Sequence, residues 1–297
     1  MQTKPFPHVV HGMESIGRFL LRLGEFVRFS HTIFALPFAL IAMLVAGSGR
    51  VPWRVFGWIL FCMVTGRTAA MCFNRLVDWE FDKENPRTAS RHTLLRKSNA
   101  WAVFAVSIGG LVLGTWELNR LCFYLSPIML VLITFYSVTK RFTALSHLFL
   151  GVALSVAPMG AWAAVRGELS SIQPYVLAAA VLCWVFGFDL IYATLDTEFD
   201  RAKGLFSFPA RFGLRASLRL ARILHALATF AFLAFGWLAA LGPFYWVAWL
   251  VVLAALVWEH RSVDPSNPAS INAAFFHANA LVSMSLLAGV CLNYFVS

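Results

Sequence analysis

The sequence has 297 residues, of which 60% are hydrophobic and only 13% are charged, and its net charge is +10. Soluble domains contain about a quarter charged residues, so this composition excludes a soluble globular fold and predicts a polytopic membrane protein. We expect one all-α membrane domain over residues 1–297, without a nucleic-acid partner, because basic loops between the apolar segments account for the charge. The five cysteines form no CxxC pair, which excludes a disulfide framework and a zinc ribbon.

Residues 1–30 form a basic segment ahead of the first apolar stretch. This segment has neither an early apolar core nor a small-residue cleavage site, so we expect an amphipathic cytoplasmic lead-in and not a signal peptide. Apolar spans follow, each near the roughly 20 residues that a bilayer helix needs. We expect nine transmembrane helices at about 31–48, 53–77, 99–117, 121–139, 145–165, 173–195, 217–241, 243–258 and 272–295.

The charges between the spans predict the topology. The loops after the second, fourth, sixth and eighth spans carry most of the lysines and arginines outside the spans, whereas the opposite loops carry only Arg50, Arg54, Arg120 and Arg166. By the positive-inside rule, the N-terminus lies in the cytoplasm and the C-terminus lies outside.

Polar residues at regular spacing close the second span. Asn74, Asp78 and Asp82 recur every four residues, so they share one face of a helix that continues into the loop. Asn85 and Pro86 are expected to end this helix just beyond Asp82. Carboxylate and amide oxygens are the ligands that hard cations such as Mg2+ prefer. The pattern therefore predicts a cation site on the last turns of the helix.

A second set of regularly spaced polar residues lies at the end of the sixth span. We call Asn74, Asp78 and Asp82 the first polar ladder and this second set the second polar ladder. Asp189, Tyr192, Asp196 and Asp200 also share one helix face, and Gly204 is expected to end that helix. Both ladders emerge on the side with the basic loops, which is the cytoplasmic side. We expect the remaining chain to bring the two ladders together.

Acidic residues at a helix C-terminus need a compensating cation, because they repel one another and the negative end of the helix dipole. Divalent metal is one source of positive charge. The neighbouring loops supply another in Arg87, Arg91, Lys140, Arg141 and Lys203. A diphosphate with a long hydrocarbon tail would engage the metal, these cations and the apolar bundle. The pattern thus predicts metal-assisted departure of pyrophosphate from a lipid diphosphate, in a cavity open to the cytoplasmic leaflet.

Two ionisable residues lie deeper in the spans. Arg67 precedes Asn74 by two helical turns on the same face, and Asp189 is its counterpart in the second half. Intramembrane charges indicate a functional cavity, although a structural ion pair between Arg67 and Asp189 is an alternative. Tyr192 has an alternative role at the membrane interface. We interpret four histidines without mutual ligand spacing as interfacial or packing residues: His31, His147, His225 and His277.

Three runs together resemble motifs of the UbiA superfamily of intramembrane aromatic prenyltransferases. NRLVDWEFD from Asn74, with NPRTASR behind it, resembles the NxxxDxxxD region of that family. The run from Asp189 to Gly204 is similar to its second aspartate motif, and FYSVTKRFT from Phe135 is similar to its YxxxKR segment. The resemblance covers essentially the whole chain. It implies a nine-helix bundle that transfers a polyprenyl group from its diphosphate to an aromatic ring carbon, with Mg2+ as cofactor.

The resemblance also implies ligands for the metal. Asn74, Asp78 and Asp82 would bind one magnesium ion, and Asp196 and Asp200 would bind another. The catalytic candidates are therefore these four aspartates, together with Tyr192.

For the substrates, the resemblance implies that Arg87, Lys140 and Arg141 bind the diphosphate. Tyr192 and Arg67 become candidates for lining the site near the reacting carbon or the acceptor, and Arg28 is a further candidate. The implied partners are polyprenyl diphosphate, an aromatic acid and the lipid bilayer. The implied location is the bacterial cytoplasmic (inner) membrane, with the active site facing the cytoplasm.

Two acceptors stay open, and we expect 4-hydroxybenzoate, for ubiquinone, ahead of 1,4-dihydroxy-6-naphthoate, for menaquinone. The run FSHTIFALPF from Phe29 is similar to the naphthoate branch of the family, and Arg91-His92-Thr93 stands where the hydroxybenzoate branch often has Arg-Pro-Leu. An arginine such as Arg67 or Arg28 would hold the carboxylate of either acid.

Two other classes of protein are alternatives to an enzyme. A transporter of an anionic lipid-linked substrate would also carry intramembrane charges, but inverted repeats would place the two ladders on opposite sides of the membrane. A structural membrane protein would not explain two acidic ladders.

Overall fold

The computed structural model describes residues 8–264 and 267–296, and within these ranges every regular element is a helix. Nine of the described segments are long and apolar enough to cross a membrane, which confirms the predicted all-α bundle of an integral membrane protein. The spans are formed by η1 with α2, α3, α5, α6, α7, α8 with its extension, α11, α12 and α13. Their bounds are Phe29–Phe34 with Leu36–Ala46, Trp53–Val77, Lys97–Leu118, Arg120–Thr139, Ser146–Arg166, Gln173–Ala193, Leu214–Leu238, Pro243–Ser262 and Pro268–Phe295.

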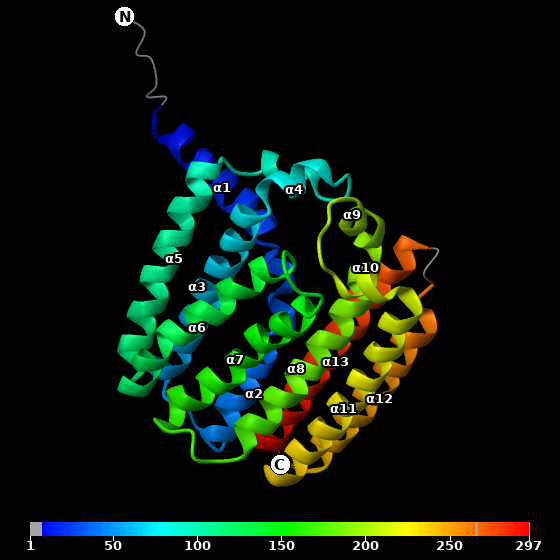
Figure 1. Cartoon of the computed structure of the whole chain (residues 1–297). Coiled ribbons are helices and arrows are strands. Elements are labelled where there is room, and N and C mark those ends of the chain that lie inside the picture. Colours follow the sequence, from blue (N-terminus) through cyan, green and yellow to red (C-terminus); the bar gives the residue numbers. More distant parts are fainter. Residues whose placement is uncertain (1–7, 265–266, 297) are drawn as a thin grey trace, which may run out of the picture.

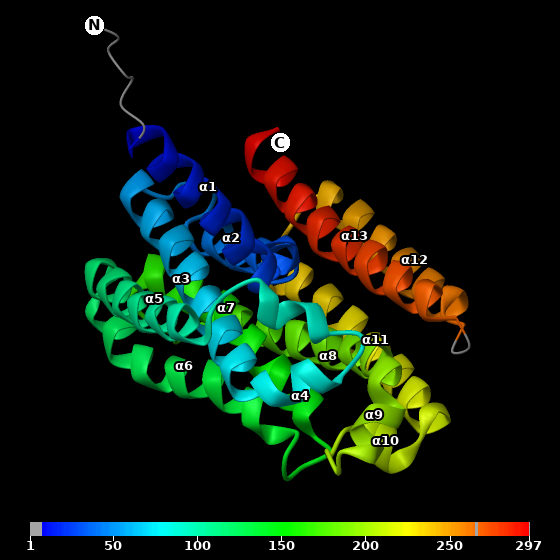
Figure 2. The same ribbon diagram turned by 90° about the horizontal axis from the view of Figure 1, so that it is seen from above.

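The remaining helices are short or amphipathic and gather at one end of the bundle. They are α1 (His8–Phe26), α4 (Trp79–Glu84), η2 (Ala89–Thr93), η3 (Thr194–Asp196), α9 (Thr197–Ala202) and α10 (Phe208–Phe212). Figure 1 shows α4 and α9 at the end opposite to the C-terminus, above the long helices. In the view from above, α4 lies over the middle of the bundle, whereas α9 and α10 lie at one edge and α1 lies at the opposite edge (Figure 2). Residues 1–7 of the predicted lead-in lie outside the described residues.

The centre of the bundle is built by α2 and α8. Both helices are apolar around their whole circumference, as expected for helices enclosed by others. Phe38 of α2 lies 5.1 Å from the ring of Trp184 in α8 and stacks on Phe232 of α11 at 5.6 Å. Such interlocked aromatic rings give a rigid wall behind the neighbouring helices.

Helix α8 also packs against α11. A Cβ added at Gly187 would collide with the imidazole of His225. Glycine at this position therefore leaves room for the imidazole, and a side chain here would require His225 or the helices themselves to shift.

The two polar ladders do not continue their helices, and this part of the prediction was wrong. Helix α3 ends at Val77, Asp78 takes φ −90° and ψ 13°, and α4 begins anew at Trp79. Likewise α8 ends at Ala193 before η3 and α9. The breaks have an electrostatic reason. They move Asp82 and Asp200 into the first turns of α4 and α9, where the helix dipole favours acids.

Candidate active site

A cavity of about 690 Å3 lies between the helices α3, α6, α7 and α8. Its lining is polar at the end beneath α4 and apolar along the rest of its length. Asp78 and Asp196 line the polar end, and Leu118 and Leu169 line the other. A deep apolar cavity with a few convergent polar groups is the usual form of a small-molecule site.

The structure sorts the predicted site residues into two groups. Ten of them line this cavity: Arg28, Arg67, Asn74, Asp78, Arg87, Arg91, Lys140, Asp189, Tyr192 and Asp196. Four of them do not line it but lie around its polar end: Asp82, Arg141, Asp200 and Lys203.

Arg87 joins the two halves of the site. Its Nε donates to Oδ1 of Asp196 at 2.9 Å, a second N–H of the same guanidinium donates to Oδ2, and a third donates to the Tyr192 hydroxyl at 2.9 Å. Asn85 donates to Asp196 from the same loop at 3.1 Å. The loop behind the first ladder thus holds the second ladder in place. The carboxylate beside it also raises the pKa of Arg87 despite the burial of the guanidinium.

Asp78 is the carboxylate of the first ladder that faces the cavity. Its oxygens lie 3.6 Å from the guanidinium of Arg141 and 3.5 Å from the amide nitrogen of Asn74. Burial, followed by the charge of nearby Asp82, raises the pKa of Asp78 to about 6. A carboxylate whose charge is disfavoured in this way fits a site that receives a cation.

Asp82 and Asp200 are engaged by basic side chains. Asp82 lies 3.0 Å from Arg91 and 3.4 Å from Arg75, and Asp200, which is almost fully buried, lies 2.9 Å from Lys140. Among the described residues, no three His, Cys, Asp or Glu side chains are already arranged to hold a metal ion. Metal binding by these acids therefore requires some of their basic partners to move to another anion.

Arg75 was missed by the sequence analysis. Its guanidinium is buried, lines the cavity and contacts Asp82. The available signal was its position two helical turns before Asp82 on the same helix face.

Arg67 and Arg28 are the cavity arginines without a carboxylate partner in the described part of the chain. Arg67 donates to the carbonyl oxygen of Arg28 at 3.0 Å, and its buried Nε has no hydrogen-bond partner. Arg28 takes the left-handed φ of 47° and approaches the Tyr192 hydroxyl at 3.5 Å. Since a left-handed arginine is strained, the bond from Arg67 helps to hold it there.

The alternative ion pair between Arg67 and Asp189 was wrong. Asp189 instead lies 2.6 Å from Nδ1 of His147, and both side chains line the cavity. The interpretation of His147 as a packing residue was therefore incomplete. Its position opposite an intramembrane acid follows from the packing of α7 on α8, which the sequence spacing does not reveal.

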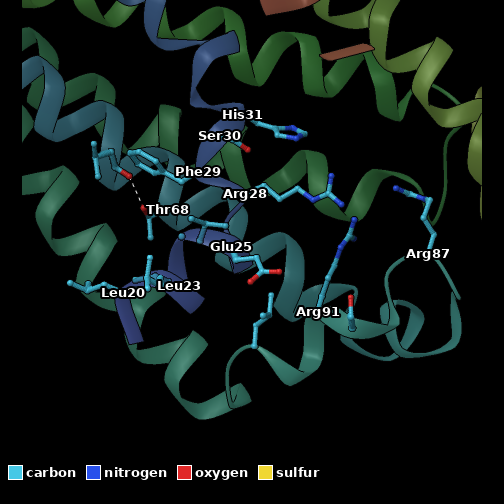
Figure 3. Close-up of a pocket in the computed structure, with 16 residues that line it drawn as sticks. Leu20, Leu23, Glu25, Arg28, Phe29, Ser30, His31, Thr68, Arg87 and Arg91 are labelled. Atoms are coloured by element: carbon cyan, nitrogen blue, oxygen red, sulfur yellow. Dashed lines mark hydrogen bonds between the residues drawn. The ribbon is translucent and has the colours of Figure 1, made fainter. Parts of the chain in front are cut away.

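A second cavity, of about 740 Å3, lies between α1, η1, α3 and η2. It shares Arg28, His31, Arg87 and Arg91 with the first cavity, so these residues line the boundary between the two spaces. Figure 3 shows Arg28, from the chain before η1, and Arg87 and Arg91, from around η2, extending toward the same region. This basic partition adds to the anion-binding character of the polar end.

Lys203 is placed differently from the other predicted cations. It pairs with Glu84 of α4, and both side chains are substantially exposed to solvent. Exposed pairs of this kind contribute little to stability. Lys203 thus links α9 to α4 outside the cavity.

An integral membrane bundle with carboxylates and arginines at one end of an apolar cavity defines the general class of this protein, an intramembrane protein with a small-molecule site that is polar at one end. The model of the UbiA prenyltransferase family matches residues 35–281. The chain belongs to this family and is a prenyltransferase, as the motifs predicted. Family membership favours the enzyme over the transporter and the structural protein.

Similar proteins cover the chain almost end to end. The 4-hydroxybenzoate octaprenyltransferase of Shewanella sediminis is 28% identical, over 93% of this chain and 96% of its own length. The 4-hydroxybenzoate solanesyltransferase of Synechocystis sp. is 26% identical, over 86% of this chain and 88% of its own.

Solved structures share the fold. The apo structure of a UbiA homolog from Aeropyrum pernix is 29% identical, with a TM-score of 0.80 over 89% of this chain and 98% of the other. A UbiA homolog from Archaeoglobus fulgidus bound to GPP and Mg2+ is 16% identical, with a TM-score of 0.66 over 91% and 99%.

Proposed function

We propose that the protein transfers a polyprenyl group from polyprenyl diphosphate to an aromatic acid, with 4-hydroxybenzoate as the acceptor and Mg2+ as the cofactor. The contact of Arg87 with Asp196 and Tyr192 carries the proposal, because it joins both acidic segments at the polar end of an apolar cavity. The names of the relatives support this acceptor.

The acidic residues fit a magnesium site. Asn74, Asp78 and Asp82 would hold one ion, and Asp196 and Asp200 would hold another. Asp78 and Asp196 face the cavity, so they are the first to meet an incoming ion. Mg2+ bound there would bridge the protein to the diphosphate and neutralise the charge that develops on departing pyrophosphate.

The basic residues around the carboxylates fit the diphosphate. Arg87, Arg91 and Lys140 line the cavity, each already in contact with an aspartate. Arg141 and Lys203 lie at its rim. If Asp196 held a metal ion, Arg87 would be free to contact a diphosphate oxygen, and its fork of N–H groups suits that anion. The departing pyrophosphate keeps the electron pair of the broken C–O bond.

The acceptor carboxylate fits Arg67 and Arg28, which have no acid partner among the described residues. Tyr192 lies between Arg28 and Arg87, so an aromatic ring beside it would stand between the carboxylate site and the diphosphate site. Asp189, three residues before Tyr192 in α8, also faces this space. Held close to the prenyl group, the ring carbon would form a bond to the prenyl carbon that the diphosphate leaves. The same ring carbon would then lose its proton to a base at the polar end, such as the departed pyrophosphate.

The proposed location is the bacterial inner membrane, with the N-terminus and the active site in the cytoplasm. The basic loops support this orientation, since they gather at the same end as α4 and α9.

The function is tested by offering 4-hydroxybenzoate and 1,4-dihydroxy-6-naphthoate in separate reactions. Isolated membranes receive polyprenyl diphosphate and Mg2+, and prenylated products are identified by mass. Product from the benzoate alone supports the proposal. If product forms from the naphthoate alone, the enzyme belongs to menaquinone synthesis instead. The sequence around Phe29 and His92 would then explain this choice of acceptor. No product from either acid, with folded protein, overturns the assignment.

A further inference from the structure

The first cavity, which contains Asp78 and Asp196 at its polar end, extends far beyond that end, along α6 and α7. These helices pack side by side (Figure 1) and supply lining residues from Ser137 to Cys122 on α6 and from His147 to Ala163 on α7. At 1.5 Å per residue, the lined stretch of α7 is about 24 Å long. The cavity thus crosses most of the roughly 30 Å hydrocarbon thickness of a bilayer.

Gly160 lies near the deep end of this channel. It lines the cavity, and a Cβ added to it would meet no atom within 4 Å. Its carbonyl oxygen is 4.0 Å from the sulfur of Cys122, which places it against the start of α6.

Packing does not explain this glycine. Gly151, on the same helix, is required because an added Cβ would lie 2.8 Å from the carbonyl oxygen of Leu182. Gly160 has no such neighbour, although glycine inside a helix is unfavourable. The space that Gly160 leaves free belongs to the cavity.

We propose that the polyprenyl tail lies along α6 and α7 and that Gly160 sets the longest tail that the enzyme accepts. The inference rests on the proposed function, because it assigns the apolar channel to the donor. A tail that ends before Gly160 does not require the space beside it. A longer tail must pass this position, so a bulky side chain here would exclude long donors and spare short ones.

The first test measures transfer from geranyl diphosphate and octaprenyl diphosphate to the acceptor that the wild-type protein uses. Gly160→Phe should lower kcat/KM for the octaprenyl donor by about tenfold or more, the discrimination expected when an apolar pocket loses room. Transfer of the geranyl group should remain near the wild-type level, which also shows that the variant is folded. An equal loss of transfer from both donors, or no loss with either donor, overturns the inference.

Gly57→Phe is the matched control. Gly57 of α3 is also a helical glycine without an atom near an added Cβ, but it lines neither cavity. We expect this variant to use both donors as the wild type does. If the wild-type protein transfers neither group, the proposed function fails. If the wild type transfers both groups and Gly160→Phe does not discriminate between the two donors, only the role of Gly160 in tail length is refuted.

A second test does not depend on catalysis. Gly160→Cys is treated with a small maleimide in membranes, and octaprenyl diphosphate should slow its labelling more than geranyl diphosphate does. Gly57→Cys should be labelled at the same rate with either compound. A Gly160→Cys thiol that is unreactive, or equally protected by both donors, would contradict a channel that long tails alone fill to this depth.

Discussion

Replacing Arg87 by alanine removes the side chain that ties the loop after α4 to the second acidic segment. The variant loses two hydrogen bonds to the carboxylate of Asp196 and one to Tyr192. Asp196 is largely buried, with 12% of its side chain exposed, and keeps only the amide of Asn85 as a polar partner among the contacts described.

Breaking a fully buried ion pair costs about 3–5 kcal/mol, because the remaining charge stays uncompensated. The Arg87 side chain is 30% exposed, so solvent reduces this loss. We therefore expect Arg87→Ala to lower the free energy of unfolding by about 2 kcal/mol. Arg87→Lys should recover part of this, since lysine keeps the charge but not the fork of donors.

Arg54 provides the control for this prediction. Its guanidinium lies 2.7 Å from the carboxylate of Glu117, but the arginine side chain is 66% exposed. Arg54→Ala should therefore cost at most about 0.5 kcal/mol. Both variants are compared with the wild type by denaturant-induced unfolding in detergent micelles. Equal destabilisation by Arg87→Ala and Arg54→Ala would refute the reasoning that the buried contact across the site sets the difference.

Three further predictions concern the metal, the orientation and the packing. Asp78→Asn and Asp196→Asn should each abolish Mg2+-dependent prenyl transfer while the protein still folds in the membrane. EDTA should stop the wild-type reaction until Mg2+ is restored. Undiminished turnover in either variant would refute the metal-bridged mechanism. Cysteines introduced as Ser90→Cys and Leu205→Cys should react with a membrane-impermeant maleimide only from the cytoplasmic side, and labelling from opposite sides would separate the two acidic segments. Gly187→Ala should lower the melting temperature, because its methyl group has no room against α11; an unchanged transition would show that this helix pair can adjust.

The order and number of the spans could be predicted from composition, because a bilayer requires each crossing helix to be long and apolar. The polar ends of the second and sixth spans could be predicted too, since ionisable groups are rare in such segments. Whether the helices continue through those ends or break there could not be predicted from the sequence. A spacing of four fits a continuous helix at Asp78, and it fits equally well a helix that stops there and restarts at Trp79. The difference depends on the dipoles of short helices at the end of the bundle.

By itself, the sequence determined the membrane class, the nine spans and the positions of the acids, because these follow from local composition and spacing. Only the tertiary structure decided the partners. Arg87 meets Asp196 across 109 positions of sequence, and His147 meets Asp189 because α7 packs on α8. Similarly, the open space at Gly160 exists only because α6 and α7 enclose a cavity there. Such contacts depend on which helices are neighbours and how deeply each one lies, and local spacing contains neither fact.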